Sequence, residues 1–453
     1  MATFYIEAIE DTDITLTKVG SPTVGSASYG IDDHAVSNTY TYGNSIHLTA
    51  GQKCYWWITS TTTAFSPLKY LKFTSTGRIN VGGNLSDLIG GDNAIPRNYC
   101  FCYLFRQCAT LVDASNLVMV NNFNSKTYCY QYMFNGCTSL TAAPELPATT
   151  LADYCYQYMF YDCTALTTAP ELPATTLASN CYYMMFRNCT SLTSAPALPA
   201  TTLAGYCYLG MFSGCTSLTT APELPATTLA PECYYGMFND CTALTTAPEL
   251  PATTLVESCY YAMFNDCTAL TTAPELPATT LADYCYYEMF SGCTSLTAAP
   301  ELPATTLADY CYEYMFYDCT SIKLSETQTG DYTAPYRIPK EGAGTTASYS
   351  LSDMFENTGG TFTGTPTINT IYYLWKDTSA LSVTYNGDII ISEDVESPCI
   401  ISYKGQTLVS IDANTTKTLN CNGKYMEDNV GIGSRTLNCA GKVMASDVVV
   451  EVT

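Results

Sequence analysis

The chain carries little charge, and most of that charge has one sign. Of its 453 residues 13% are charged, with 18 Lys and Arg against 41 Asp and Glu, so the net charge is -23. Proteins that bind nucleic acid neutralise its phosphates with Lys and Arg, and anionic membrane surfaces attract the same residues. We therefore expect no nucleic-acid partner and no attraction to an anionic membrane.

Long apolar runs, histidines and close pairs of metal ligands are also scarce. No run reaches the roughly 18 residues that span a bilayer, and the amino terminus lacks the basic and apolar regions of a signal peptide. We expect no membrane insertion and no secretory route. The two histidines are His34 and His47, and there is no Cys-x-x-Cys, Gly-x-Ser-x-Gly or phosphate-binding loop. The sequence therefore predicts no enzyme, with no catalytic residue, metal site or cofactor.

Tyrosine, cysteine and one repeated unit are abundant. Tyr occurs 38 times and Cys 23 times. The unit has 26 residues and reads Cys-Tyr-x-x-Met-Phe-x-x-Cys-Thr-Ser/Ala-Leu-Thr-x-Ala-Pro-Glu-Leu-Pro-Ala-Thr-Thr-Leu-Ala-x-x, numbered here from position 1 at its first Cys. One unit cannot bury its apolar face alone, so neighbouring units must stack into a solenoid. The regular copies begin at Cys129, Cys155, Cys181, Cys207, Cys233, Cys259, Cys285 and Cys311.

Divergent copies stand at both ends of this regular array. A copy with Cys100 and Cys108 precedes it, and a remnant with Met354 and Phe355 follows it. Divergent end units are typical of a solenoid, because they must cap the core.

Positions 1 to 9 of the unit predict a short helix. At about 100° per residue, the constant positions 1, 2, 5, 6 and 9 fall on one face and the variable positions 3, 4, 7 and 8 on the other. Asp153, Asp283 and Asp309 stand where an N-cap is expected. For the rest of the unit we expect one or two short extended segments, with Leu at positions 12, 18 and 23 inward and ladders of Thr. The predicted fold class is an α/β leucine-rich-repeat solenoid flanked by small all-β domains.

The residues Met-Phe-x-x-Cys-Thr-Ser-Leu resemble BspA-like leucine-rich repeats, most of all a variety found in gut Bacteroidetes surface proteins and their phages. The resemblance covers residues 96–325 and 350–358. It implies a binding scaffold and does not specify a ligand.

The segments before and after the repeats differ from them in residue pattern. Residues 1–95 show short alternating runs and turn signals, which favour a small β-sandwich. We expect the solenoid to span residues 96–360, and residues 361–453 to form β modules. The related segments 418–426 and 436–444, with Leu-x-Cys-x-Gly-Lys-x-Met, resemble a small module of phage tail and baseplate-associated proteins.

The repeated cysteines are expected to be reduced, small core residues. On a helix, positions 1 and 9 lie about 12 Å apart, and neighbouring helices pack about 8–10 Å apart, beyond disulfide reach. The alternative is a disulfide-stapled secreted adhesin.

A ladder of glutamates recurs at position 17, at Glu145, Glu171, Glu223, Glu249, Glu275 and Glu301. We interpret it as a solvated edge. A row of cation-binding carboxylates is the alternative, because stacked carboxylates repel unless they are separated or neutralised.

The variable face is the candidate binding surface. Outward Tyr supplies a large amphipathic contact area at low entropy cost, and its rings are suited to stacking on sugars. Drift at unrestrained positions explains the variability of this face but not its excess of Tyr. The candidate binding residues are Tyr132, Tyr154, Tyr158, Tyr161, Tyr183, Arg187, Tyr206, Tyr235, Tyr261, Tyr284, Tyr287, Tyr310, Tyr314 and Tyr317.

These features predict a non-enzymatic phage structural protein, a tail- or virion-attached fibre or adhesin. Its solenoid is expected to bind a host-surface glycan or protein, a β end domain is expected to contact other virion proteins, and a homo-oligomer is compatible with this role. The alternatives are a bacterial cell-surface adhesin and, third, a polysaccharide depolymerase. Strict repetition disfavours the depolymerase, because a catalytic carboxylate pair should break the pattern at one unit.

Overall fold

The computed structural model describes residues 2–375 except 21, 23, 60–64, 90, 92–96, 124 and 340–346, and beyond residue 375 it describes only the backbone of strands. Two compact units are present. The first contains Met1–Thr320, Arg337–Thr358 and Thr363–Thr370, and the second contains Ser321–Tyr336, Gly359–Phe362 and Ile371–Thr453. The domain boundaries expected from the sequence stay predictions.

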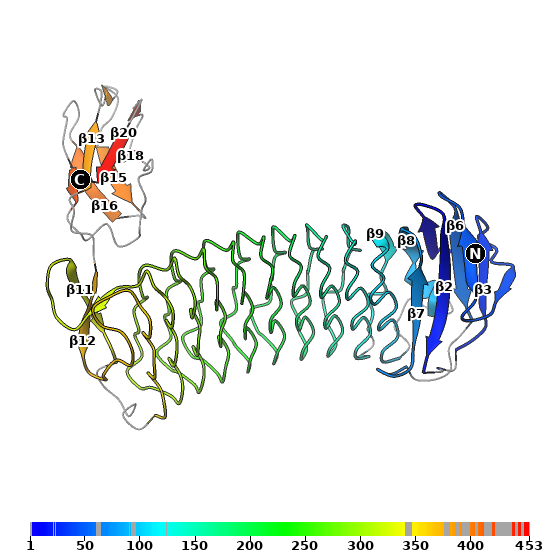
Figure 1. Cartoon of the computed structure of the whole chain (residues 1–453), viewed down its shortest axis with the longest axis horizontal. Helices are drawn as coiled ribbons and strands as arrows, with labels where there is room; N and C mark the ends of the chain where they lie inside the picture. The colour runs from blue at the N-terminus through cyan, green and yellow to red at the C-terminus, as the bar shows by residue number, and fades with distance from the viewer. Residues whose placement is uncertain are drawn as a thin grey trace. The chain divides into compact units, whose positions relative to one another are not determined.

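The first unit begins with two packed β-sheets (Figure 1). Rings from the two sheets meet in the core, where the Trp56 and Phe73 centroids lie 5.2 Å apart. Within the larger sheet, the Tyr40 and Trp56 centroids lie 4.8 Å apart. The order of one sheet is β4-β3-β6-β1-β8-β9 and that of the other is β5-β2-β7. The strands are β1 (Tyr5–Ala8), β2 (Thr12–Val19), β3 (Ala27–Ile31), β4 (Asn38–Tyr40), β5 (Ser45–Leu48), β6 (Lys53–Ile58), β7 (Tyr70–Ser75), β8 (Ile79–Asn84) and β9 (Leu111–Val118), and the 3-10 helix η1 (Leu85–Ile89) follows β8.

The repeats form successive coils of a solenoid, but the predicted short helix is wrong. None of the residues that the structure describes forms an α-helix, and positions 1 to 8 are a chain of turns. The predicted α/β class is therefore corrected to a solenoid of turns and isolated β-bridges that follows a β-sandwich. Asp153, Asp283 and Asp309 cap no helix. Each accepts a backbone N–H from the next coil, as Asp153 Oδ1 does from Ser179 at 3.0 Å.

Hydrogen bonds between coils replace those of a helix. The N–H of Tyr130 donates to Cys155 O at 2.9 Å, and the N–H of Phe134 donates to Met159 O at 3.0 Å. The intervening N–H groups donate three residues back within their own coil, as Met133 does to Tyr130 O at 3.1 Å. Alternate residues thus bond along the solenoid and along the chain, which satisfies the backbone without a helix.

This bonding requires a left-handed residue at every fourth position. Positions 26, 4 and 8 have positive φ in coil after coil, between 48° and 61° where the residue is not Gly. Position 8 is Gly, Asp or Asn in all eight regular copies, and these residue types tolerate that region best. The sequence therefore carried a signal against a helix. The true period is four residues, or about 90° per residue, whereas a helix turns about 100° per residue. Over eight steps the two differ by only about 80°. The helical wheel therefore still separated inward from outward positions.

Constant side chains form continuous columns inside the coils. The position 2 tyrosines stack with centroids 5.7–5.8 Å apart from Tyr130 to Tyr312. The position 6 phenylalanines stack at 5.4–5.8 Å from Phe134 to Phe316. Leu at positions 12 and 18 is also buried, as in Leu140 and Leu146. Such columns bury large aromatic areas that one coil alone leaves in water.

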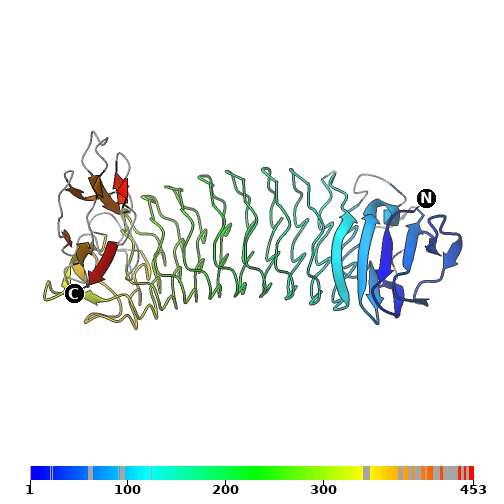
Figure 2. The same cartoon turned by 90° about the horizontal axis from the view of Figure 1, so that it is seen from above.

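The β-sandwich continues into the solenoid. Strand β8 pairs in parallel with β9, which lies in the first coil, and a parallel bridge from Asp113 to Ala142 extends the pairing to the next coil (Figure 2). Phe73 of β7 stacks on Phe105 at 5.6 Å and so forms the first ring of the Phe column. The sandwich therefore covers the apolar end of the solenoid. Farther on, parallel bridges join Thr residues at position 22 and Thr or Ser at position 14, as expected for Thr ladders.

The repeated cysteines are free and buried, as predicted. The Cys-to-Cys distances behind that prediction, however, assumed helices. Coils joined by strand-like bonds lie about 4.8 Å apart. Side chains in parallel register keep about this spacing at Cβ, which exceeds the 3.5–4.5 Å of a disulfide. At position 9 each Sγ instead donates to the position 6 carbonyl of the preceding coil at 3.0–3.2 Å, as Cys163 does to Phe134 O.

The second unit consists of short strands. The sheet orders are β10-β12-β11, β17-β13-β20, β14-β19 and β16-β15-β18. Parts of the segments 418–426 and 436–444 lie outside the described residues, but β17 and β18 occupy equivalent places in them. The strands are β10 (Leu324–Ser325), β11 (Tyr332–Arg337), β12 (Ile371–Trp375), β13 (Leu381–Tyr385), β14 (Ile390–Ile391), β15 (Cys399–Tyr403), β16 (Gln406–Ile411), β17 (Leu419–Cys421), β18 (Leu437–Cys439), β19 (Val443–Met444) and β20 (Val448–Val452). Within the described part of the chain, no helix has the length and apolarity needed to cross a membrane.

The inner tyrosine column provides a matched stability test. Tyr260 has a buried hydroxyl without a hydrogen-bond partner, whereas the Tyr130 hydroxyl donates to Val120 O at 2.6 Å. We expect Tyr260→Phe to raise the free energy of unfolding by about 1 kcal/mol and Tyr130→Phe to lower it by about 1 kcal/mol. Urea denaturation measures both. Equal losses in the two variants would mean that the Tyr260 hydroxyl has a partner after all.

The thiols provide a second test. Burial raises the pKa of Cys181, Cys233 and Cys311 to about 12 and holds the pKa of Cys163 well above its usual range. Since the thiolate is the reactive form, we expect the 20 cysteines described as buried to resist iodoacetamide in the native protein even at pH 9. In denaturant without reductant all 23 should react. Mass spectrometry counts the adducts, and a shortfall in denaturant would reveal disulfides.

Candidate functional site

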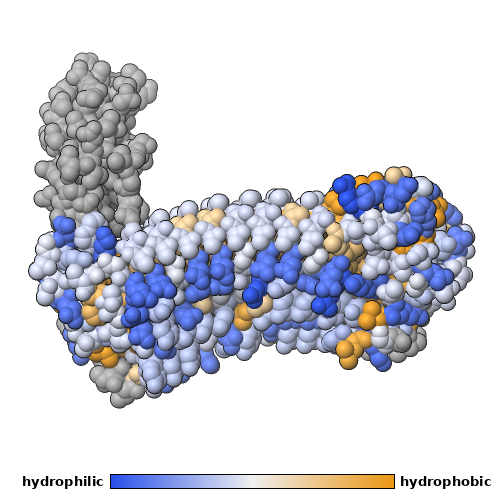
Figure 3. Space-filling view, in the orientation of Figure 1, coloured by the Kyte–Doolittle hydropathy of each residue, from blue (hydrophilic) through white to orange (hydrophobic). Residues whose placement is uncertain are grey.

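Most variable side chains lie on the outside of the coils, and they include the predicted binding residues, whereas Gln131, Gln157, Leu209 and Glu313 at position 3 are buried. Tyr206 is 38% exposed and the other thirteen are half-buried. We call the outward side chains at positions 3, 4 and 7 the Tyr-lined face. Hydrophilic residues gather in a band along the coils in the space-filling view (Figure 3). The structure brings twelve of the thirteen predicted tyrosines together, in two groups on this face and in columns at position 26. Tyr206 joins none of them, because the neighbouring coils have Asn180 and Glu232 at position 26.

The N-terminal tyrosine cluster consists of the half-buried Tyr132, Tyr158, Tyr161 and Tyr183 together with Tyr103, which is buried. Tyr132 stacks on Tyr158 at 4.5 Å and on Tyr103 at 5.2 Å. Tyr158 also meets Tyr161 and Tyr183 edge to face, at 5.7 and 5.2 Å. Every ring of the cluster therefore contacts another one, and the cluster spans three successive coils of the regular pattern and the first coil.

The C-terminal tyrosine cluster consists of Tyr235, Tyr261, Tyr287, Tyr314 and Tyr317. The first three rings stack at 4.3 and 4.5 Å. Tyr314 then meets Tyr287 and Tyr317 edge to face, at 5.7 and 5.6 Å. The cluster extends over four coils. Beside Tyr235 and Tyr261, position 4 is Gly236 and Ala262, so no side chain larger than methyl stands there, whereas beside Tyr287 it is Glu288.

Two further columns stand at position 26, and they contain residues that the sequence reasoning missed. Tyr154 stacks on Tyr128 at 4.3 Å, and Tyr128 stacks on Tyr99 at 4.4 Å. At the other end Tyr310 stacks on Tyr284 at 4.4 Å and on Tyr349, which is 63% exposed. The missed residues Tyr99, Tyr103, Tyr128 and Tyr349 belong to or border the divergent copies. Counting repeat positions into those copies would have found them.

Stacking decides which part of each ring a partner meets. At 4.3–4.5 Å the rings of Tyr235, Tyr261 and Tyr287 cover each other's faces. Their edges and hydroxyl groups are the parts left to point outward. The expected stacking of these rings on sugars is therefore restricted to the ends of the columns, and the columns themselves present rows of hydroxyl groups and ring edges.

Charge divides the Tyr-lined face in two. The Arg106 guanidinium carbon lies 5.3 Å from the ring centroids of both Tyr103 and Tyr132, which is a cation–π geometry. Arg187 is the only Lys or Arg between Cys129 and Tyr310. Its Nη1 lies 3.4 Å from Met184 Sδ, and its buried Nε has no hydrogen-bond partner. The N-terminal cluster thus stands next to positive charge.

The C-terminal cluster stands among carboxylates. Burial raises the pKa of Glu288, and the Asp266 carboxylate raises it further. Burial followed by the charges of Asp353 and Glu288 raises the pKa of Glu313. Burial also raises the pKa of Tyr287 to about 12, with Glu288 adding to the effect. This half of the face therefore repels anions and favours a neutral or cationic partner group.

The glutamates of position 17 lie apart from the Tyr-lined face. Glu145, Glu171, Glu223, Glu249, Glu275 and Glu301 are all exposed, in agreement with a solvated edge. Among the described residues no group of His, Cys, Asp and Glu is arranged to hold a metal ion. The two histidines lie in the β-sandwich, where His47 Nδ1 is 2.9 Å from Asp13 Oδ1 and His34 Nδ1 is 2.9 Å from Ala2 O.

Comparison with known proteins places the repeats in a recognised class. Residues 112–244 and 206–323 match the family "BspA type Leucine rich repeat region" in six copies, so the resemblance read from Met-Phe-x-x-Cys-Thr-Ser-Leu is confirmed for these coils. A solved leucine-rich repeat protein from Bacteroides ovatus is 19% identical, over 49% of this chain and 68% of that chain, with a TM-score of 0.24. None of the curated proteins compared with the chain is significantly similar to it.

The raised pKa of Glu288 predicts a pH-dependent effect of its replacement. Since its folded-state pKa lies above the unfolded value, the ionised form disfavours folding, and that penalty appears as the pH rises above the unfolded value of about 4.3. We expect Glu288→Gln to raise the thermal midpoint at pH 8 and to leave it nearly unchanged at pH 4. Calorimetry at the two pH values measures this. The exposed Glu301→Gln is the control, and an equal gain from it would contradict the assignment.

Proposed function

We propose that this protein is a non-enzymatic binding protein whose Tyr-lined face contacts a glycan or protein on a bacterial cell surface. The observation that carries the proposal is the grouping of outward tyrosines into two clusters of contacting rings, with centroids 4.3–5.7 Å apart. Tyr gives binding surfaces a large amphipathic area with few rotatable bonds. Mutual stacking restricts these rings before any partner arrives, which lowers the entropy lost on binding.

The two clusters are suited to different parts of one partner. Arg106 and Arg187 favour an acidic or carbonyl-rich group at the N-terminal cluster, while Glu288 and Glu313 favour a neutral or basic group at the C-terminal cluster. Rows of tyrosine hydroxyls offer hydrogen bonds that recur from coil to coil. An elongated partner lying along the coils satisfies these conditions better than a small molecule does.

We further propose that the protein is carried on the outside of a phage virion as a tail fibre or adhesin. The support is the resemblance of segments 418–426 and 436–444 to a module of phage tail and baseplate-associated proteins. In this proposal a β end domain contacts other virion proteins and the solenoid meets the host. The same repeat class also suits a bacterial cell-surface adhesin, so the location needs a direct test.

The binding role predicts a specific loss when outward tyrosines are removed. We expect the labelled full chain to bind whole cells of at least one strain in a panel of gut Bacteroidetes, and Tyr261→Ala with Tyr287→Ala to weaken this binding by roughly tenfold or more, since central aromatic anchors each contribute about 2 kcal/mol or more. Flow cytometry measures binding. The inner-column variant Tyr260→Phe is the control.

Two outcomes would contradict the proposal. Unchanged binding by the double variant, with its thermal midpoint retained, would remove the Tyr-lined face from the binding role. Detection of the protein by mass spectrometry in cell envelopes but not in purified virions would replace the virion location by that of a cell-surface adhesin.

A further inference from the structure

The first coil departs from the 26-residue repeat. The departure lies in a part of the unit away from positions 3, 4 and 7, which form the tyrosine clusters. From Cys100 to Cys129 there are 29 residues instead of 26, and Val-Asn-Asn-Phe-Asn-Ser-Lys stands where other coils have Pro-Ala-Thr-Thr-Leu-Ala. Val120 O accepts the Tyr130 hydroxyl at 2.6 Å, and Lys126 O accepts the Cys129 thiol at 3.2 Å. The longer segment is therefore anchored to the solenoid at both of its ends.

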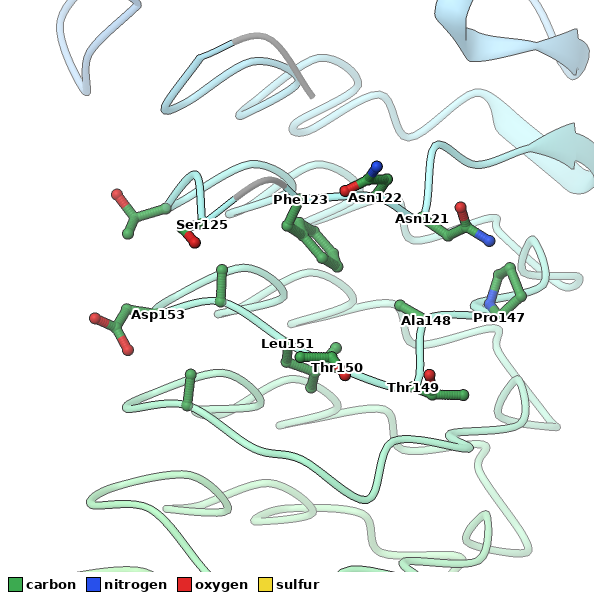
Figure 4. Close-up of a pocket in the computed structure, with 13 residues that line it drawn as sticks. Asn121, Asn122, Phe123, Ser125, Pro147, Ala148, Thr149, Thr150, Leu151 and Asp153 are labelled. Atoms are coloured by element: carbon green, nitrogen blue, oxygen red, sulfur yellow. The ribbon is translucent and has the colours of Figure 1, made fainter. Parts of the chain in front are cut away.

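A pocket of about 500 Å³ opens between this segment and the next coil (Figure 4). Asn121, Asn122 and Ser125 line it from the first coil, and Thr149 and Asp153 line it from the second. Figure 4 shows Phe123 extending into the space between the two coils. The volume lies in the range of small-molecule sites, which is about 300–1,000 Å³. The pocket thus exists because one coil departs from an otherwise uniform repeat.

The polar side chains of this pocket are of kinds that bind hydroxyl groups. Amides of Asn donate and accept, hydroxyls of Ser and Thr do the same, and the Asp153 carboxylate accepts. Asp153 Oδ1 already accepts the N–H of Ser179 at 3.0 Å, which fixes the carboxylate at the rim. No Lys, Arg or His is among the thirteen lining residues. A phosphate or carboxylate ligand would find no counter-charge among the lining residues and one repelling carboxylate.

The remaining lining residues supply a small apolar patch. The Phe123 ring is fixed by edge contacts to Tyr130 and Tyr156, at 6.0 and 5.7 Å with planes 80° and 83° apart. Phe123 and Leu151 are 5% and 7% exposed, so Pro147 supplies most of the exposed apolar surface of the lining. A ligand that combines several hydroxyl groups with one C–H face matches this mixture, and a sugar ring is such a ligand.

We propose that this pocket binds one neutral sugar unit. The site is separate from the Tyr-lined face and does not depend on the function proposed for that face. Its specificity comes from the Asn and Thr side chains, its preference for a neutral ring from Asp153, and its position from the three extra residues of the first coil.

Saturation-transfer NMR on the full chain tests the proposal. The probes are glucose, galactose, mannose, N-acetylglucosamine and N-acetylgalactosamine, with glucuronate as the anionic comparison. We expect a signal from at least one neutral sugar at millimolar concentration and none from glucuronate. Absence of any neutral-sugar signal, or an equal signal from glucuronate, would overturn the proposal.

The repeat provides a matched pair of variants. Thr149→Tyr fills the pocket, whereas Thr201→Tyr places the same side chain at the same repeat position of a regular coil. Both threonines are exposed, so both variants should fold. We expect Thr149→Tyr to weaken sugar binding by roughly tenfold or more and Thr201→Tyr to leave it unchanged. Equal binding by both variants would overturn the assignment to this pocket. Retained sugar binding by Tyr261→Ala would separate this site from the Tyr-lined face.

Discussion

The hydrogen bonds that join each coil to the next are the constraint on which the rest of the structure depends. Alternate N–H groups along positions 26 to 8 donate to the following coil, as Tyr130 does to Cys155 O at 2.9 Å. This bonding fixes the register between coils and requires a left-handed residue at every fourth position. The register then stacks equal side chains on equal side chains, which makes the Tyr and Phe columns of the core. It also places each position 9 thiol against a carbonyl of the preceding coil, where the thiol stays protonated.

The same register shapes the outer surface. A tyrosine at an outward position lies one coil spacing from the residue at that position in the next coil, so two tyrosines in succession stack. The clusters around Tyr158 and Tyr261 are therefore preformed, and their ring faces are largely used within the protein. Charge differs between the clusters because Arg106 and Arg187 lie in the first coils, whereas Glu288 and Glu313 lie in the last. The uniform core thus carries a surface whose chemistry changes along its length.

Departures from uniformity occur at the first coil, and they serve two purposes. Strand β9 pairs with β8, so the β-sandwich covers the end of the solenoid, and Phe73 completes the Phe column. In the same coil three extra residues open the pocket beside Phe123 and Asp153. A regular coil cannot form such a pocket, because its Pro-Ala-Thr-Thr-Leu segment follows that of its neighbour. Structural capping and a distinct chemical environment therefore arise from one divergent copy.

The sequence by itself determined the repeat, the inward and outward positions, the buried cysteines and the outward tyrosines, because burial repeats with the unit and is visible in which residues stay constant. It did not determine the backbone. The N–H of Tyr130 bonds 25 residues further along the chain, and over nine residues the inward positions fit a four-residue period and a helix almost equally. Gly136, Asp162 and Asn188 at position 8 pointed to the left-handed turns, but the partners of those turns lie in another coil. Only the tertiary structure decided which tyrosines stack, how Arg106 and Glu288 divide the face, and where the pocket opens, since each depends on the stacking of one coil on the next.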